Sequence, residues 1–233
     1  MKEFVKRKVL GVGFSMASEG EVLEYIVENL TSKYYVVTPN PEILVMANRD
    51  LEYKKALNSA RLSLPDGIGV MLASKFLGVS LKEKIAGIDL VESLCGKVAK
   101  RPITVGFLGG GPKIADKTAE CLKKRFPVLR IGFCGSEIRN FDDLKGTDIL
   151  FVAFGSPKQE FWIANNLKRL PVRVAIGVGG SFDIISGNLP RAPRFMRSFG
   201  LEWLFRLIIQ PWRIKRQLSL LTFIFLVLKE KMM

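Results

Sequence analysis

The sequence contains no histidine among its 233 residues. This absence excludes Ser-His-Asp and Cys-His catalysis, zinc sites built on imidazole, and a histidine general base. Acid–base chemistry must therefore depend on a carboxylate, Lys, Tyr or Cys. Cysteine is also scarce, with three residues far apart and no C-x-x-C pair. Together with the lack of a recognisable signal peptide, this pattern predicts a reducing, intracellular compartment.

Long hydrophobic runs are missing as well. The most apolar run covers residues 218–228, and only 12 residues separate the flanking Arg216 and Lys229. As a helix these 12 residues would measure about 18 Å. The hydrocarbon core of a bilayer is about 30 Å thick and needs roughly 20 apolar residues. The run is therefore too short to span a membrane.

Positive charge, in contrast, is abundant. Lys and Arg number 36 against 22 Asp and Glu, so the net charge is +14 and predicts an anionic partner. Half of this excess lies in residues 190–233, where basic residues alternate with Trp203 and Trp212. This mixture favours a helical segment that lies on an anionic membrane. A helix docked on the core and a contact in a homo-oligomer are the alternatives, and the sequence does not fix the oligomeric state.

The chain is 48% hydrophobic and 25% charged, which excludes a disordered or fibrous protein. Short apolar segments alternate with helical patterns, and this alternation predicts a mostly parallel α/β sheet flanked by helices. We expect a core at residues 1–190 and a basic, apolar appendage at 191–233. Strands are expected at residues 9–14, 34–38, 60–64, 103–108, 129–134, 148–154 and 172–176. Helical patterns are expected at about 19–32, 42–58, 69–76 and 89–99. Two further helices are expected to begin after residues 109–112 and 156–157 and to end at about 125 and 169.

Ligands of open α/β sheets bind beyond the carboxyl ends of the strands, so the polar residues at these ends are of interest. Asn40, followed by Pro41, fits a helix N-cap, but it also offers an amide next to the hydroxyl of Thr38. Asp66 lies in a Pro-Asp-Gly turn, where it either caps the next helix or acts as a general base. Asp89 and Asp183 are its rivals for that role.

Two further loops suggest anion binding. The segment Gly-Gly-Gly-Pro-Lys113 either cradles a phosphate or makes a tight turn, and it matches no G-x-G-x-x-G or Walker A pattern. Ser156 and Gln159 have the spacing of a capping box, with Pro157 at the first helical position. Lys158 would be a cation at a helix N-terminus, where the helix dipole disfavours it. A bound anion would resolve that conflict.

Metal and cofactor signals are weak. The sequence has no Asp-x-Asp pair, and the adjacent Asp142 and Asp143 lie in a polar stretch, so we expect no catalytic divalent cation. A nicotinamide-dependent oxidoreductase would need the dinucleotide fingerprint that is missing. A non-catalytic basic module is a second rival. Binding of nucleic acid is not expected, because the aromatic residues of the basic region belong to its hydrophobic tail.

Eight short segments form a specific pattern when they are taken together in their order along the chain. They are TPNP at 38–41, LPDGI at 64–68, GID at 87–89, FGSPKQE at 154–160, GGSFD at 179–183, SG at 186–187, PRAP at 190–193 and GLEWLFR at 200–206. With these segments the sequence resembles the WecG/TagA/CpsF glycosyltransferase family over nearly its whole length. The resemblance implies a Rossmann-like α/β core with a helical, membrane-binding C-terminal appendage at the inner face of the cell membrane.

The resemblance also implies an activity. It is an inverting, metal-independent transfer of N-acetylmannosamine from UDP to the 4-hydroxyl of N-acetylglucosamine on undecaprenyl diphosphate, without a cofactor. This reaction belongs to synthesis of the wall teichoic acid linkage unit. Other members of the family transfer a uronic acid or a neutral hexose, so the UDP-sugar donor and the lipid-linked acceptor stay open.

Carried over by motif, the resemblance makes Asp66 the catalytic base. The residues expected to bind substrate are Thr38, Asn40, Asp89, Gln159, Asp183, Arg206, Arg213 and Arg216. The three arginines, at offsets of seven and three, are expected on one side of a helix, facing the diphosphates. One departure is visible, because Lys84 stands where the family pattern has an arginine, and lysine cannot make the same paired contact.

Overall fold

The computed structural model describes residues 3–232, of which the side chains at 213 and 215–217 are outside the description. Within this part of the chain six parallel strands form one sheet in the order β4-β3-β8-β7-β5-β6. The strands are β3 (Tyr34–Val37), β4 (Leu62–Ser63), β5 (Thr104–Gly109), β6 (Arg130–Gly135), β7 (Ile149–Ala153) and β8 (Val174–Gly177). The predicted parallel α/β sheet is confirmed.

The N-terminal strand differs from the prediction. A single strand over residues 9–14 is wrong, because the chain turns at Leu10 and Gly11, whose φ angles are 52° and 75°. The turn produces an antiparallel hairpin of β1 (Lys6–Val9) and β2 (Val12–Ser15), which is separate from the main sheet. The apolar pattern of this segment predicts extended backbone, which both strands have, but no sequence pattern predicts a positive φ at a leucine.

Helices connect the strands as the alternation predicts. They are α1 (Glu19–Glu28), α2 (Pro41–Arg49), α3 (Leu51–Asn58), α4 (Ile68–Phe76), α5 (Gly87–Val98), α6 (Ile114–Arg125), α7 (Lys158–Asn166) and α8 (Ser181–Ile185), with a 3₁₀ turn, η1 (Phe141–Leu144). The helical patterns expected at 42–58 are confirmed, and they form two helices, α2 and α3. Asp50 has extended backbone angles that end α2, and its side chain accepts a hydrogen bond from the Tyr53 N–H to start α3.

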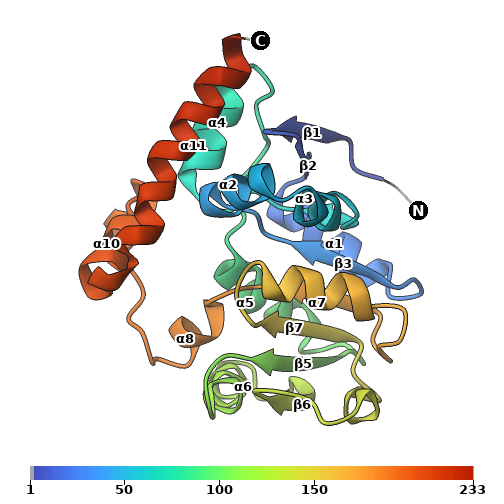
Figure 1. The fold of residues 1–233 in the computed structure, drawn as a ribbon. Coiled ribbons are helices and arrows are strands. Elements are labelled where there is room, and N and C mark those ends of the chain that lie inside the picture. Colours follow the sequence, from blue (N-terminus) through green and yellow to red (C-terminus); the bar gives the residue numbers. More distant parts are fainter. Residues whose placement is uncertain (1–2, 233) are drawn as a thin grey trace.

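The helices cover the sheet on both faces (Figure 1). Helices α1, α5, α6 and α8 bury their apolar residues against one face, and α2, α3 and α7 against the other. Strand β3 shows the alternation that this arrangement requires, since Tyr34 and Val36 belong to the first layer and Tyr35 and Val37 to the second. Full burial of a large apolar side chain contributes roughly 1.5–3 kcal/mol, so both layers hold the sheet rigidly.

The C-terminal segment folds over the second layer. It contains α9 (Arg194–Ser198), α10 (Glu202–Ile209), η2 (Pro211–Arg213) and α11 (Ile214–Met232). Helix α11 runs along α2 and α4 towards the C-terminus (Figure 1). Phe223 and Val227 are buried in this contact, and the Glu230 carboxylate accepts a hydrogen bond from the Leu10 N–H at 3.2 Å. The alternative in which the tail docks on the core therefore holds for one side of α11.

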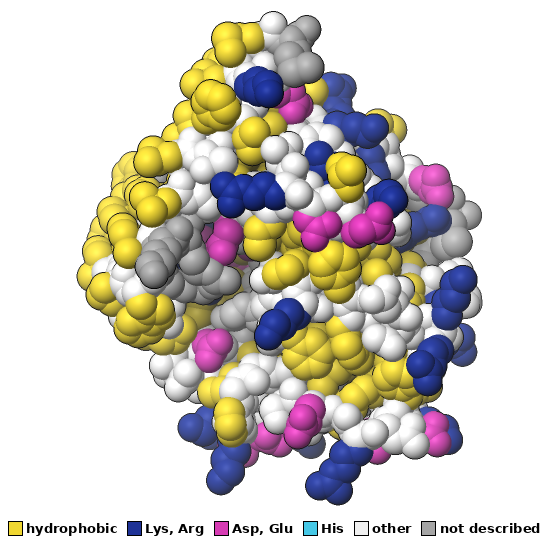
Figure 2. Space-filling view, in the orientation of Figure 1, with side chains coloured by type: hydrophobic (Ala, Val, Ile, Leu, Met, Phe, Trp, Pro, Cys, Tyr) yellow, Lys and Arg dark blue, Asp and Glu magenta, His cyan; other side chains and the backbone are white. Residues whose placement is uncertain are grey.

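The other side of α11 is exposed and apolar. Leu221 and Phe225 are 67% and 64% exposed, and hydrophobic side chains line this edge of the molecule over α10 and α11 (Figure 2). The apolar side chains of α11 thus lie on two sides of the helix, one packed against the protein and the other exposed. Across residues 3–232, no helix is both long and apolar enough to cross a membrane.

Candidate functional site

The site lies where the parallel strands end. The loops that follow β3, β4, β7 and β8 all line a cavity of about 630 Å³, which α4, α10 and α11 close on the other side. A second cavity of about 690 Å³ begins beside it and extends over the ends of β5 and β7. Asn40, Ser156, Gly179, Gly180 and Arg206 line both cavities, so the two form one connected site.

Asp66 is half-buried in the first cavity, directly after β4. Its backbone N–H donates to the Pro39 carbonyl at 3.0 Å, which fixes it beside the loop after β3. Helix α4 has Gly67 as its N-cap, with a φ of 92° and no capping side chain. Asp66 is therefore not the cap of α4, and its carboxylate is left for the cavity.

Charges of both signs act on Asp66. Burial raises the pKa of this carboxyl to about 6, against the opposing effect of the Arg206 guanidinium. The Glu202 carboxylate raises the pKa further and the Lys84 ammonium lowers it. Asp66 is thus ionised at neutral pH with a raised affinity for a proton, which is the condition a general base needs.

Lys84 reaches the site from the loop between α4 and α5. The next residue, Ile85, donates its N–H to the Pro65 carbonyl at 2.9 Å, which holds the loop against the turn that carries Asp66. Across the cavity mouth, the Lys84 ammonium lies 3.7 Å from the Glu202 carboxylate of α10. In place of the arginine expected from the family pattern, a lysine thus links the core to the C-terminal segment.

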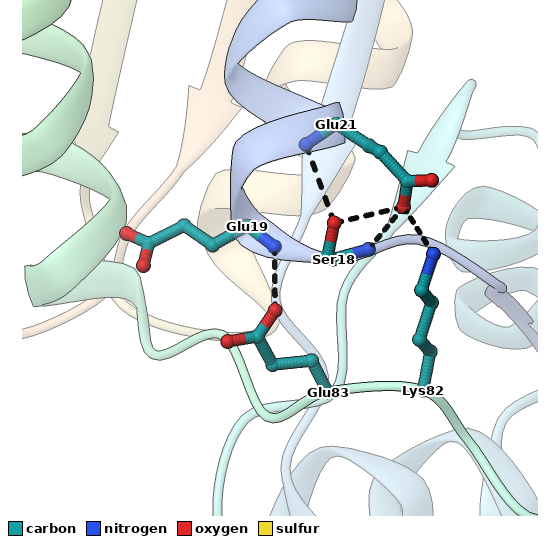
Figure 3. Close-up of polar contacts among 5 residues, drawn as sticks. All are labelled: Ser18, Glu19, Glu21, Lys82 and Glu83. Carbon is teal, nitrogen blue, oxygen red and sulfur yellow. Dashed lines mark hydrogen bonds and ion pairs between the residues drawn. The ribbon is translucent and has the colours of Figure 1, made fainter.

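The same loop is held at the start of α1 (Figure 3). Lys82 donates to Glu21 at 2.6 Å, and the Glu83 carboxylate accepts from the Glu19 N–H at 2.8 Å. Glu21 also accepts from the Ser18 N–H at 2.7 Å and completes a capping box. Exposed ion pairs of this kind contribute little stability, so their effect is to fix the path of the loop.

The predicted residues after β3 lie in the first cavity. Asn40 accepts from the Ile43 N–H at 3.0 Å and caps α2, with Pro41 at the first position, so the capping prediction is confirmed. The Thr38 hydroxyl donates to the Gly177 carbonyl at 3.2 Å and joins the ends of β3 and β8. Both side chains therefore stabilise the strand-end loops of the cavity that they line.

The predicted capping box after β7 is wrong. Helix α7 begins at Lys158, its N-cap is Pro157, and no side chain caps it. The Ser156–Pro157 peptide bond is cis. Ser156 instead donates to the Glu160 carboxylate at 2.8 Å, and the Gln159 carbonyl oxygen accepts from the Gly179 N–H at 3.0 Å. The residues of the motif thus connect to one another and to the loop after β8.

The two rival carboxylates have different surroundings. Asp89 forms an ion pair with Arg191, which also binds Glu92 at 3.2 Å. This contact ties the start of α5 to the segment that leads into α9. Asp183 lines the second cavity and accepts from the Asn188 amide at 3.1 Å. Of the three acids, Asp66 is the one that lines the first cavity.

The predicted arginines do not share one helix. Arg206 belongs to α10, Arg213 to η2 and Arg216 to α11, because Gln210 leaves the helical region with φ −126° and ψ 73°. The expectation of a single helix face is therefore wrong. Arg206 lines both cavities. The side chains of Arg213 and Arg216 lie outside the described residues.

The second cavity is lined by backbone and by polar side chains. Gly110 and Gly111 follow β5, and Lys158 and Trp162 come from α7. Lys113 has a φ of 60° and precedes α6, but it is not among the lining residues of this cavity. The Gly110 N–H already donates to the Ala153 carbonyl at 2.9 Å, so an anion at this loop would have to bind to other backbone N–H groups.

Three carboxylates in or next to the site have no role predicted from the sequence, and one of them, Glu42 of α2, lines both cavities. Glu202 lies in the GLEWLFR segment and lines the first cavity, and Glu160 ends the FGSPKQE segment and is 1% exposed. An acid next to exposed tryptophan, or one inside a helix, has no spacing signal that separates it from a surface residue. Among the described residues, no group of three or more Cys, Asp and Glu side chains forms a metal site.

Known proteins are similar to this chain over most of its length. The family model of the glycosyl transferase WecG/TagA/CpsF family matches residues 7–233. Three bacterial relatives carry the name N-acetylglucosaminyldiphosphoundecaprenol N-acetyl-beta-D-mannosaminyltransferase. The protein of Bacillus spizizenii is 40% identical over 84% of this chain and 79% of its own length. Those of Bacillus subtilis and Staphylococcus aureus are 35% and 31% identical, over 90% and 97% of this chain and 90% and 93% of their own lengths. The chain therefore belongs to the WecG/TagA/CpsF family of glycosyltransferases.

Proposed function

We propose that this chain transfers N-acetylmannosamine from UDP to the 4-hydroxyl of N-acetylglucosamine on undecaprenyl diphosphate. The names of the bacterial relatives support the sugar and the lipid-linked acceptor. The observation that carries the proposal is the carboxylate of Asp66 in one cavity with the guanidinium of Arg206. Glycosyl transfer from a nucleotide diphosphate needs both a proton acceptor and a positive charge for the leaving group.

The reaction we propose is a single displacement. The acceptor O4 attacks the anomeric carbon of N-acetylmannosamine from the face opposite UDP, and its proton passes to the Asp66 carboxylate. As the new bond forms, the bond between the anomeric carbon and the β-phosphate oxygen breaks, and UDP keeps that electron pair. The configuration at the anomeric carbon inverts. Asp66 then releases the proton to water, which its pKa of about 6 permits at neutral pH.

The departing UDP gains negative charge, which side chains would have to neutralise. Arg206 lines both cavities, Lys84 lines the first and Lys158 the second, so cations surround the region that the cavities share. Guanidinium groups bind phosphate oxygens through paired N–H donors and do not lose their charge. We assign Arg213 and Arg216 to the same task from the family resemblance.

The division of the site suggests where each substrate binds. We place UDP in the second cavity, with phosphates near Gly110 and Gly111 and the ribose near Asp183. Thr38, Asn40 and Gln159 would then surround the transferred sugar at the junction. The first cavity would take the acceptor sugar and the start of its lipid, because it continues between apolar side chains of α4 and α11. These include Leu72, Phe76, Phe223, Ile224 and Leu228.

We further propose that the chain attaches to the inner face of the cell membrane through α10 and α11. Their exposed edge is apolar, and the C-terminal segment carries half of the positive charge excess. Apolar burial in the interface together with attraction to anionic lipid is the usual basis of such binding. Attachment at this edge would bring the mouth of the first cavity to the lipid-linked acceptor.

A panel of UDP-sugars tests the donor and the acceptor together. With a short-chain polyprenyl-diphosphate-linked N-acetylglucosamine, UDP-N-acetylmannosamine is expected to give the highest kcat/KM, because the relatives carry this activity in their names. The measurement is the release of UDP together with the mass of the product. A higher kcat/KM with UDP-glucose or a UDP-uronic acid would assign the chain to another branch of the family.

Treatment with EDTA is expected to leave the rate unchanged. The reason is the lack of an Asp-x-Asp pair in the sequence and the surplus of basic residues around the junction of the cavities. The rate should be measured after chelation and again after addition of Mg²⁺ or Mn²⁺. A chelated enzyme that is inactive and recovers with either ion would overturn the metal-independent reaction.

A further inference from the structure

Glu160 is a buried acid that the proposed reaction does not use. It is 1% exposed and belongs to α7, close to the junction of the two cavities. Among the described residues it forms no ion pair with Lys or Arg; its partners are neutral donors. They are the Tyr53 hydroxyl at 3.0 Å, the Ser156 hydroxyl at 2.8 Å and the Gln159 amide at 2.7 Å. Burial raises the pKa of Glu160, and these donors oppose the rise.

Burial of a carboxyl without a cation lowers stability unless hydrogen bonds replace the lost hydration. Here two of its three bonds, those with Ser156 and Gln159, lead to residues that line the site. Glu160 holds the Nε2 side of the Gln159 amide, and the opposite oxygen of that amide accepts from the Gly179 N–H at 3.0 Å. The amide cannot rotate by 180° without placing its oxygen against the carboxylate. Glu160 therefore fixes which side of Gln159 meets Gly179.

Close packing strengthens this connection. Gln159 is 2% exposed and lies against the end of β8, where a Cβ on Gly177 would come within 3.1 Å of its Nε2. Gly179 has a φ of 54°, and a Cβ on Gly180 would lie 3.9 Å from the Arg206 guanidinium. The loop that Gln159 holds is thus the backbone that adjoins Arg206 and lines both cavities.

We propose that Glu160 is a positioning residue for donor binding: held by Tyr53 and Ser156, it orients Gln159, which sets the backbone of Gly179 and Gly180. This inference rests on the proposed function, because it assigns the loop to the UDP-sugar. The chain of hydrogen bonds begins on α3, passes through α7 and ends after β8. A shift of the loop by about 1 Å would misplace donor and Arg206 together, and such shifts cost up to about 100-fold in rate.

Two variants of Glu160 separate hydrogen bonding from packing. Glu160→Gln keeps an oxygen for Ser156 and Gln159, while its new amide group can donate to the Tyr53 hydroxyl, so donor KM and UDP affinity should stay within about threefold of the parent. Glu160→Leu keeps the volume but removes the acceptor. It is expected to raise donor KM and the Kd of UDP, measured by calorimetry, by about tenfold or more. KM for the acceptor should change less.

A matched pair of tyrosine variants tests the same chain if Glu160→Leu fails to fold. Tyr53→Phe removes one donor from Glu160. Tyr35→Phe also removes a buried hydroxyl, which donates to the Ala56 carbonyl of the same helix α3 but not to Glu160. Both changes should lower the melting temperature, yet Tyr53→Phe alone should raise donor KM and the Kd of UDP.

The outcomes distinguish this inference from the proposed function. If the parent protein neither binds UDP nor uses any UDP-sugar, the proposed function fails. If the parent is active and Tyr53→Phe, like Tyr35→Phe, changes stability without changing donor KM or the Kd of UDP, Glu160 has only a structural role and the inference is wrong. Loss of activity in Glu160→Gln at unchanged folding would also overturn it, because the charge and not the orientation would then matter.

Discussion

Asp66→Asn is expected to lower kcat by about 10²–10⁴-fold, the usual contribution of a general base. The asparagine has nearly the same size but accepts no proton at neutral pH. Folding and UDP binding should be retained, because the backbone bond from residue 66 to Pro39 does not depend on the side chain. Steady-state rates, UDP titration and thermal melting of the parent and the variant measure the three properties.

The pH dependence gives an independent check on the same residue. Since the pKa of Asp66 is raised to about 6, kcat/KM of the parent should fall as the pH drops below 6, and the fall should be absent in the residual rate of Asp66→Asn. The raised pKa also means that the folded protein disfavours the ionised form. Above pH 6 the parent therefore carries a cost that the variant lacks, and the variant should melt at the same or a higher temperature.

A rate within threefold of the parent would remove Asp66 from this role. Glu202 would then be the next residue to test, because its carboxylate lines the same cavity. Asp89, the rival expected from the sequence, is less suitable because it is paired with Arg191. Glu202→Gln removes a neighbouring charge and the partner of Lys84 but leaves Asp66 in place, so it should lower the rate far less than Asp66→Asn if Asp66 is the base.

Most of the core could be predicted from the sequence because its signals are local. Short apolar strands and amphipathic helices alternate, and every strand of the main sheet lies within a few residues of its predicted range. The structure differs from the prediction where the backbone angles of single residues change the direction of the chain. Leu10 turns the hairpin with a positive φ, Asp50 divides a helix, and Gln210 interrupts the C-terminal segment. The pattern of apolar and polar residues does not specify these backbone angles.

The site could be predicted only in part, for a similar reason. Motifs at strand ends identify Asp66, Thr38 and Asn40, because the carboxyl ends of parallel strands all lie at the same edge of the sheet. Contacts between distant segments are not visible in this way. The pairing of Lys84 with Glu202 joins residues 118 positions apart, and the chain from Tyr53 to Gly179 crosses three separate elements. Long-range packing creates these arrangements, so they need a structure.

Removal of residues 194–233 is expected to release the protein from anionic vesicles and to abolish transfer to a water-soluble acceptor. The segment contributes Arg206 and Glu202 to the first cavity, so it belongs to the site as well as to the proposed membrane face. Truncation would also uncover the apolar surface beneath Phe223 and Val227, and loss of folding could then explain both effects. Single substitutions in the full chain avoid that difficulty.

Arg206→Ala should lower kcat on the soluble acceptor by about 10²–10³-fold, as the loss of one donor to a developing negative charge does. Its binding to vesicles should change little, since one basic residue near an anionic leaflet contributes about 1 kcal/mol. Arg206→Lys should recover only part of the rate, because an ammonium cannot pair two phosphate oxygens in the same geometry.

The complementary variant exchanges Leu221 and Phe225, on the exposed side of α11, for serine. It should lose most vesicle binding in a sedimentation assay and keep the rate on the soluble acceptor, because these side chains are more than 60% exposed and do not line either cavity. The two variants are thus expected to lose different properties: Arg206→Ala loses catalytic rate, and the serine variant loses vesicle binding. If Arg206→Ala keeps the parent rate, Arg206 does not meet the diphosphate charge, and that task falls to other basic residues such as Lys158, Arg191, Arg213 or Arg216.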